Sequence, residues 1–335
     1  MEGEECNDAL ARQRFSGGAI SQLNGFVAAQ LAARSVKAVI PAVAVRRISR
    51  TSLQRVRDVS THRNPEKPMD RKISKLRDIL IRHKRVLIAF SGGVDSSFLL
   101  AFAVKTLGRN NVLAVTAVSE TYPKQELVNA RAMAAKLGAR HKILRTCELN
   151  NIKFSSNPPE RCFYCKDELF SKLSSLAAEN KMVLCDATNY SDNSDYRPGR
   201  KAARKWAVAS PILEAKITKS KLRSFSRRLK LGNWNSPAQA CLASRIPYGT
   251  KINREELSRI ERGEEYLKKM GFNVVRIRSH GDLARLEVAA DSVRKLAQEK
   301  IRKKISVVLK KLGWKYATID MDGYKMGSLN RQIGH

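Results

Sequence analysis

The stretch that decides the fold is residues 85–97, RVLIAFSGGVDSS. Its first six residues are apolar apart from Arg85 and predict a buried strand, and residues 96–107 have the pattern of a helix. The loop between them carries Gly92 and Gly93, which allow backbone conformations closed to other residues and close approach of a ligand. Backbone N–H groups and the helix dipole attract anions at such a strand-to-helix turn, so this stretch predicts a phosphate site.

The polar residues of the loop support the same chemistry. Ser91, Ser96 and Ser97 add hydroxyl donors for a phosphate group. Asp95 is not suited to hold phosphate because like charges repel, and we expect it to cap the helix or to bind Mg²⁺. No Gly-Lys-Ser/Thr follows the glycines, so the loop is not a Walker loop, and it does not match a Rossmann fingerprint either.

Outward from the loop, apolar strands alternate with amphipathic helices. Strands are predicted at residues 85–90, 112–118, 141–144 and 182–185, and helices at 96–107, 124–137, 166–178 and 218–229. This βαβ alternation predicts an α/β fold, a doubly wound parallel sheet with helices on both faces.

The pattern changes after about residue 250. Helices are predicted at residues 254–270 and 292–312, and strands at 274–278, 283–288 and 316–319. We therefore expect two domains, a loop-bearing one at residues 69–249 and a smaller α+β one at 250–335 for substrate binding or oligomerisation. Residues 1–68 contain no acidic residue between Asp8 and Asp58, and we expect a basic, disordered extension there.

Composition narrows the class of protein. The chain has 64 Lys and Arg against 31 Asp and Glu, a formal net charge of +33, which suggests a polyanionic partner or substrate. Nucleic acid is one such partner but is not favoured over a small nucleotide. No apolar stretch of about 18 residues appears, so we expect no membrane span and a cytoplasmic protein. Six cysteines in 335 residues do not make a disulfide scaffold.

Several further motifs follow the loop in order. They are NPPERCFYCK at residues 157–166, DATN at 186–189, YRPG at 196–199, SPILE at 210–214, PAQACLASR at 237–245, HGD at 280–282, DGY at 322–324 and GSLN at 327–330. The loop itself matches the PP-loop signature of the ATP pyrophosphatases. Together, over residues 70–330, the motifs resemble the ATP-dependent sacrificial sulfur transferase family LarE.

This resemblance implies a reaction. ATP, with Mg²⁺, would be split between its α- and β-phosphates, and a carboxylate of pyridinium-3,5-biscarboxylic acid mononucleotide would be adenylated. A sulfur nucleophile would then displace AMP, and two rounds would give the dithio precursor of a nickel-pincer nucleotide. The residues expected to bind ATP are Ser91, Gly92, Gly93, Val94, Asp95, Ser96 and Ser97.

Cys241 is the expected attacking residue. Arg245 lies four residues on, where a helical turn would place a cation near the sulfur and lower its pKa. In the family, the matching cysteine either surrenders its own sulfur and becomes dehydroalanine, or joins two others in holding a 4Fe–4S cluster. Cys162 and Cys165 form a CxxC motif, expected in a loop before a helix, that could also bind zinc or form a disulfide. We favour a cluster on Cys162, Cys165 and Cys241, because three thiolates leave one iron open.

Two arginines mark an expected substrate site. Arg276 and Arg278 alternate on one predicted strand, so their side chains share a face, and they resemble family positions that bind the substrate phosphate. Other residues are assigned to the substrate, nucleotide or metal site: Glu287 and Asp282, then Glu214, and Asp186, Thr188 and Asn189, which follow a strand at the ligand edge of the sheet.

Two other functions remain open from the sequence. A tRNA-thiolating PP-loop enzyme would share the loop and the adenylation step, and the net charge favours it. A non-catalytic AMP sensor with a basic nucleic-acid-binding domain is the second. The family resemblance also implies a homo-oligomer, with a hexamer as the expectation.

Overall fold

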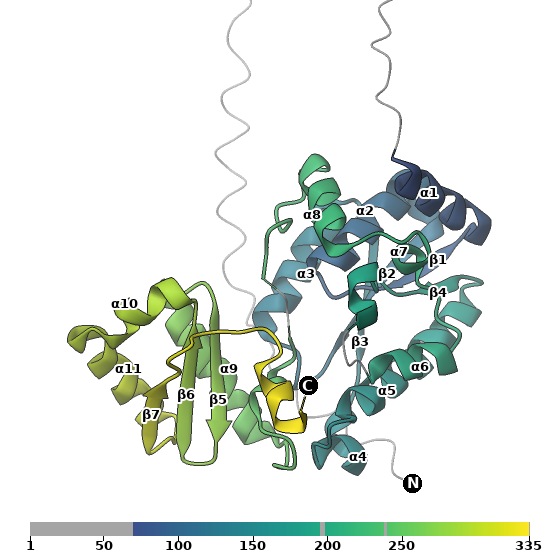
Figure 1. Ribbon diagram of the computed structural model, residues 1–335. Coiled ribbons are helices and arrows are strands. Elements are labelled where there is room, and N and C mark those ends of the chain that lie inside the picture. The colour runs from purple at the N-terminus through teal and green to yellow at the C-terminus, as the bar shows by residue number, and fades with distance from the viewer. Residues whose placement is uncertain (1–69, 195–197, 238–239, 335) are drawn as a thin grey trace, which may run out of the picture. The chain divides into compact units, whose positions relative to one another are not determined.

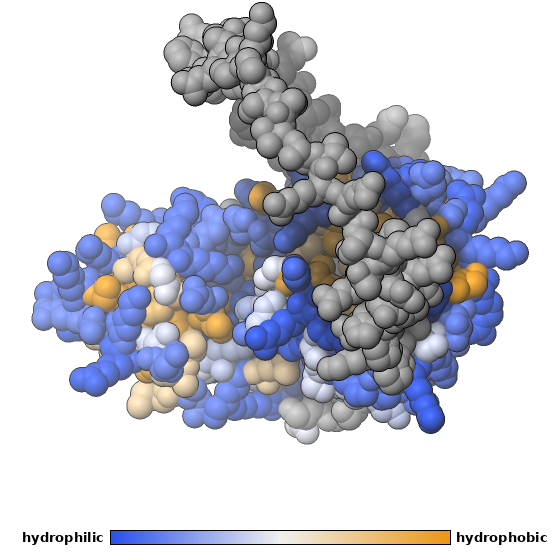
Figure 2. All heavy atoms as spheres, turned by 90° about the horizontal axis from the view of Figure 1, so that it is seen from above, coloured by the Kyte–Doolittle hydropathy of each residue, from blue (hydrophilic) through white to orange (hydrophobic). Residues whose placement is uncertain are grey.

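The computed structural model describes residues 70–194, 198–237 and 240–334. The extension predicted at residues 1–68 lies outside these ranges. None of the helices within them is both long enough and apolar enough to cross a membrane. Figure 2 shows hydrophilic side chains over most of the visible described face, with hydrophobic residues in small separate groups.

Four parallel strands form the first sheet, as predicted. They are β1 (Val86–Ala89), β2 (Val112–Val118), β3 (Arg140–Arg145) and β4 (Val183–Cys185), in the order β3-β2-β1-β4. β1, the strand that precedes the glycine loop, therefore lies between β2 and β4 (Figure 1). The carboxyl ends of β1, β2 and β3 therefore lie side by side, where ligands of parallel sheets bind.

Helices cover both faces of this sheet (Figure 1). They are α1 (Arg71–His83), α2 (Val94–Leu107), α3 (Lys124–Lys136), α5 (Arg161–Glu179), α6 (Gly199–Lys205), α7 (Pro211–Glu214) and α8 (Lys219–Arg228). The short helix α4 (Ile152–Ser155) follows β3 and belongs to neither layer. Val86 and Ile88 of β1 pack in a core with α1, α2, α3, α7 and α8, whereas Leu87 packs in another with α5 and α6. Successive strand residues thus face opposite layers, which confirms the doubly wound arrangement.

The second sheet is mixed. It contains β5 (Val275–His280), β6 (Leu283–Val288) and β7 (Tyr316–Ile319), with β5 and β6 antiparallel and β6 and β7 parallel. The helices of this part are α9 (Arg254–Lys269), α10 (Val293–Ala297) and α11 (Glu299–Lys311). Leu242, Ala243 and Ile246 pack in the same core as this sheet, so segments on both sides of the predicted boundary at residue 249 share one core.

The helix predicted at residues 292–312 is in fact two helices. Gln298, with φ −57° and ψ 135°, leaves the helical conformation between α10 and α11. Leu296 and Ile305 are nine residues apart, which would place them on opposite sides of one continuous helix. The break lets both side chains enter the same core, where they are 1% and 2% exposed.

Candidate functional site

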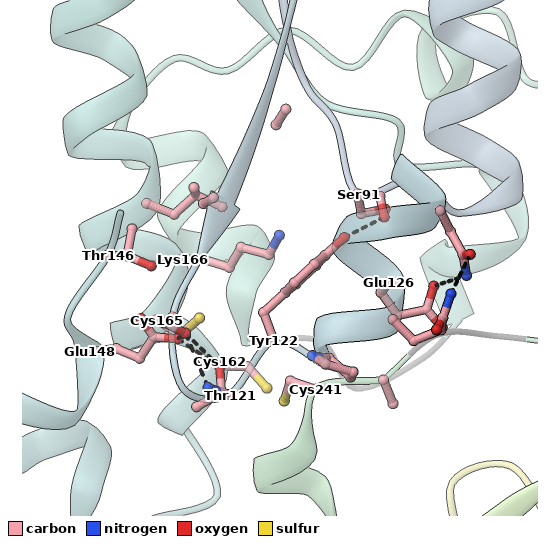
Figure 3. Close-up of a pocket in the computed structure, with 18 of the residues that line it drawn as sticks. Ser91, Thr121, Tyr122, Glu126, Thr146, Glu148, Cys162, Cys165, Lys166 and Cys241 are labelled. Carbon is pink, nitrogen blue, oxygen red and sulfur yellow. Dashed lines mark hydrogen bonds between the residues drawn. The ribbon is translucent and has the colours of Figure 1, made fainter. Parts of the chain in front are cut away.

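A cavity of about 580 Å³ opens at the carboxyl ends of β1, β2 and β3. Ser91 lines it after β1, Thr121 after β2 and Glu148 after β3 (Figure 3). The rest of the lining includes residues of α3, of α5 and of the loop that leads to Cys241, together with Arg245, Lys268, Asn273 and Arg276. One cavity therefore joins Ser91, the first residue of the phosphate loop, to the cysteines that the sequence singled out.

Side-chain hydrogen bonds fix the backbone of the phosphate loop. The Ser96 hydroxyl donates to the carbonyl of Gly93 at 3.2 Å, and the Ser97 hydroxyl donates to that of Gly92 at 3.2 Å. Asn233 donates to the Gly92 carbonyl at 2.9 Å and to Ser97 Oγ at 3.0 Å. The serines that were expected to bind phosphate thus also fix the loop, and Ser96 and Ser97 are buried.

Asp95 pairs with a lysine and does not cap α2. Both of its carboxylate oxygens accept hydrogen bonds from Lys219 of α8, at 2.6 and 2.7 Å, and Asn189 donates to one of them at 3.3 Å. The N-cap of α2 is Gly93, and no side chain caps that helix. The positive charge of Lys219 therefore balances the negative charge of the Asp95 carboxylate.

Three cysteines from distant parts of the chain line the cavity: Cys162, Cys165 and Cys241 (Figure 3). All three are thiols. Cys162 and Cys165 lie in the first turns of α5, not in a loop before it as predicted, and their i, i+3 spacing puts them on one face of the helix. Burial raises the pKa of the Cys165 thiol, and the nearby Glu148 carboxylate raises it further.

The hydrogen bonds of Arg245 near Cys241 go to backbone carbonyls. It ends the short 3₁₀ helix η5 (Leu242–Arg245), and its Nη1 donates to the carbonyls of Ala240 and Cys241 at 2.8 Å each. Its Nε and Nη2 donate to the Glu264 carboxylate at 2.8 and 3.0 Å. The expected helical turn from Cys241 to Arg245 is therefore a 3₁₀ turn, and the guanidinium charge is balanced by Glu264.

Arg276 and Arg278 both lie in β5, but their side chains have different surroundings. Arg276 lines the cavity, lies over the Tyr324 ring at 5.2 Å and is 8% exposed. Burial lowers the pKa of its guanidinium, and so does the Arg245 charge. Arg278 instead binds both carboxylate oxygens of Glu287, at 2.9 and 2.8 Å, and neither Arg278 nor Glu287 lines the cavity.

The other residues assigned from the sequence lie outside the cavity lining. Asp186 accepts hydrogen bonds from Thr188 and Ser210, so it orders the chain after β4. Asn189 donates to Asp192 at 3.0 Å. Asp282 and Glu214 form exposed ion pairs with Lys315 and Arg82, at 2.8 and 3.2 Å.

Known proteins resemble this chain over most of its length. The NAD synthase family model matches residues 73–164, which include the phosphate loop. An uncharacterized protein of Synechocystis sp. is 39% identical over 266 residues, 79% of this chain and 99% of that protein. The pyridinium-3,5-bisthiocarboxylic acid mononucleotide synthase of Lactiplantibacillus plantarum is 34% identical over 259 residues, 77% of this chain and 92% of that protein. The chain belongs to the LarE family of PP-loop enzymes.

Membership of the LarE family confirms the resemblance drawn from the loop and the later motifs, and it makes this chain an ATP-dependent enzyme. A third relative, an uncharacterized protein of Methanocaldococcus jannaschii, is 29% identical over 259 residues, 76% of this chain and 98% of that protein. All three alignments are long, and two of them span nearly the whole relative, so the likeness extends well beyond the phosphate loop.

Gly92 is the loop position of this LarE-family chain at which a side chain would be unfavourable. Its φ is +73°, and a Cβ there would lie 3.0 Å from both Cα and Cβ of Ala130 in α3. We expect Gly92→Ala to lower the free energy of unfolding by about 1–3 kcal/mol and to weaken ATP binding, because strain and contact displace the loop. Gly93, at φ −69° and ψ 168°, has a backbone that any residue adopts, contrary to the prediction.

Urea unfolding and an ATP binding isotherm would measure both effects. Gly232→Ala is the matched control, because its φ is not positive and a Cβ there would meet nothing within 4 Å. Equal stability and equal ATP affinity of the two variants would show that the loop tolerates a side chain at residue 92.

Sequence reasoning missed the polar residues that complete the cavity. Among them are the charged residues Glu126, Glu148, Arg161, Lys166 and Lys268. Glu148 lies three residues beyond the end of β3, so the rule that selected residues after β4 could have found it. Arg161 and Lys166 flank the CxxC motif and could have been read as cations beside it.

Proposed function

We propose that this protein uses ATP to adenylate a carboxylate of pyridinium-3,5-biscarboxylic acid mononucleotide and then replaces AMP by sulfur. Two rounds of this reaction give the bisthiocarboxylic acid mononucleotide, the product named in the Lactiplantibacillus plantarum relative. The observation that carries the proposal is the single cavity in which Ser91 of the phosphate loop and three cysteines meet. A nucleotide at the loop can thus present an activated carboxylate to sulfur.

The residues divide the task along the cavity. The loop at residues 91–97 receives ATP with Mg²⁺, through its backbone N–H groups and the N-terminus of α2. Arg276 is the residue proposed to hold the mononucleotide phosphate, because its side chain reaches the cavity and Arg278 is occupied by Glu287. Adenylation replaces a poor leaving group by AMP, which a sulfur nucleophile can displace.

We further propose that Cys162, Cys165 and Cys241 hold a 4Fe–4S cluster. The donor set fits: three thiols line one cavity, and three thiolates leave one iron without a protein ligand. Within the described ranges, no three His, Cys, Asp or Glu side chains gather closely enough to hold a single metal ion. The ligands of a cluster bind different irons, so they need not converge on one point. When bound, the cluster would supply sulfide for transfer at its open iron.

The cluster proposal predicts a coloured, iron-containing protein after anaerobic purification. Cys162→Ala is expected to lose most of the iron and the broad visible absorption, because it removes one of three ligands. Cys185→Ala is the matched control, since Cys185 is buried in β4 and outside the cavity lining. The iron content and the visible spectrum are measured for the wild type, Cys162→Ala and Cys185→Ala. A wild-type protein that stays colourless and iron-free after reconstitution would contradict the cluster.

One reaction tests the function as a whole. Purified protein is given ATP, Mg²⁺, sulfide and the dicarboxylate mononucleotide, and AMP, pyrophosphate and the product mass are followed. We expect both nucleotide products and a mass gain equal to the difference between sulfur and oxygen for each exchange. No pyrophosphate release with this substrate would contradict the proposal.

A tRNA-thiolating enzyme is the alternative that the net charge of +33 favours. It predicts tRNA binding that weakens steeply with salt and sulfur transfer to tRNA under the same conditions. The hexamer expected from the family resemblance and the cytoplasmic location stay predictions.

A further inference from the structure

Glu148 is a buried acid at the thiol end of the cavity. It opens the short 3₁₀ helix η3 (Glu148–Asn150) just after β3 and is 3% exposed. Its Oε1 accepts hydrogen bonds from two hydroxyls, Ser119 Oγ at 2.6 Å and Thr121 Oγ1 at 2.7 Å. Because both donors bind the same oxygen, the carboxyl group is fixed in orientation.

The second oxygen of Glu148 has no such partner. Oε2 is buried and lacks a hydrogen-bond partner among the described residues. An unpaired buried acceptor is costly, so native proteins rarely keep one without a ligand, a water or a catalytic reason. An ionised carboxylate only accepts hydrogen bonds, so its missing partner must carry a hydrogen or a positive charge.

The surroundings narrow the choice of partner. Glu148 lines the cavity together with Cys162, Cys165 and Cys241, and Figure 3 shows its side chain beside Cys165 and Thr121. ATP and the dicarboxylate mononucleotide are anions, which a carboxylate repels. The cations that suit their phosphates and carboxylates are other lining residues, Arg161, Lys166, Lys268 and Arg276. Mg²⁺ is bound with the ATP phosphates at the loop that begins at Ser91. Hydrogen sulfide is the remaining reactant, and in its undissociated form it is neutral and carries S–H donors.

We propose that Glu148 Oε2 binds hydrogen sulfide by accepting an S–H hydrogen, and so positions the sulfur for attack in the thiol end of the cavity. The proposal rests on the function proposed above. In the step that follows, a C–S bond forms at the acyl carbon. The C–O bond to AMP breaks with its electron pair on AMP, and the hydrogens of the sulfide leave as protons to solvent.

Glu148→Gln tests this role, because the amide keeps the size and one oxygen for Ser119 and Thr121 but places an NH₂ donor at the Oε2 position. We expect the apparent KM for sodium sulfide to rise about tenfold, with a smaller change of kcat at saturating sulfide. Glu148→Asp should recover part of the loss. Glu179→Gln, at the exposed end of α5, is the matched control and should leave both constants unchanged.

Measuring the adenylation half-reaction alone distinguishes a failure of the Glu148 proposal from a failure of the proposed function. Exchange of labelled pyrophosphate into ATP, measured with the mononucleotide and without sulfide, should persist in Glu148→Gln. If exchange and sulfide-dependent turnover fall together in the variant, Glu148 is structural and the proposal is overturned. An unchanged KM for sulfide also overturns it. Absence of exchange in the wild type would overturn the proposed function itself, and with it this assignment.

Discussion

Glu264→Ala is expected to lower the free energy of unfolding by about 3–5 kcal/mol. Glu264 is 3% exposed and binds the guanidinium of Arg245, itself 2% exposed, through both carboxylate oxygens. Oε1 also accepts the backbone N–H of Ile277 at 3.1 Å, so the residue joins α9, β5 and η5. The alanine variant leaves a buried guanidinium without a counter-charge. Urea unfolding at neutral pH measures the loss.

Two further variants test this explanation. Glu265→Ala, one residue along α9 and only partly buried, should change stability by less than about 0.5 kcal/mol. The double variant Arg245→Met with Glu264→Leu should recover most of the stability, because it removes both charges together. A double variant as unstable as Glu264→Ala would show that lost packing, and not the unpaired charge, is responsible.

The same pair predicts a pH dependence. Burial alone would raise the pKa of the Glu264 carboxyl, but the charge and hydrogen bonds of Arg245 outweigh burial and lower the pKa below its ordinary value of 4.5. A lowered pKa in the folded state adds stability that is fully present above that value and is lost as pH falls through the folded pKa. The stability difference between wild type and Glu264→Ala should therefore be constant near neutral pH and shrink in acid.

The first sheet was predictable because its signals are local. Each parallel strand is a short apolar run between turn residues, and β1 and its glycine loop occupy one continuous stretch. The break at Gln298 was not predictable in this way. No glycine or proline marks it, and its cause is the need of Leu296 and Ile305 to reach one core.

The sequence predicted several residues of the site, but not which charged side chains pair with one another. The cysteines were found from their motifs, and the structure brings all three to one cavity. The partners of the charged residues lie far along the chain: Lys219 is 124 residues from Asp95, and Glu264 is 19 from Arg245. Sequence periodicity reports which face a residue occupies and not which distant charge it meets, so it did not indicate Lys219 beside Asp95 or Glu264 beside Arg245.

Cys241→Ala is expected to abolish thiocarboxylate formation while leaving the adenylation half-reaction within about a factor of two of the wild type. Cys241 lies at the start of η5 and reaches the cavity, whereas the phosphate loop begins at Ser91 on another wall of it. Removal of one thiol takes away sulfur transfer without touching the groups that bind ATP. Pyrophosphate exchange and product mass are measured on the same preparation, and Cys185→Ala is the matched control.

Comparison of Cys241→Ala with Cys162→Ala then separates the two routes of sulfur transfer. A cluster needs all three thiolates, so both variants should lose transfer and iron together. In the sacrificial route the Cys241 thiolate attacks the acyl carbon, AMP leaves, and elimination across the Cα–Cβ bond releases the thiocarboxylate and leaves dehydroalanine. Cys162→Ala would then keep one turnover per chain, and the protein mass would fall by that of H₂S. Normal transfer by Cys241→Ala would contradict both routes, because each requires the Cys241 sulfur, and it would leave direct attack by the sulfide bound at Glu148 as the source of the sulfur.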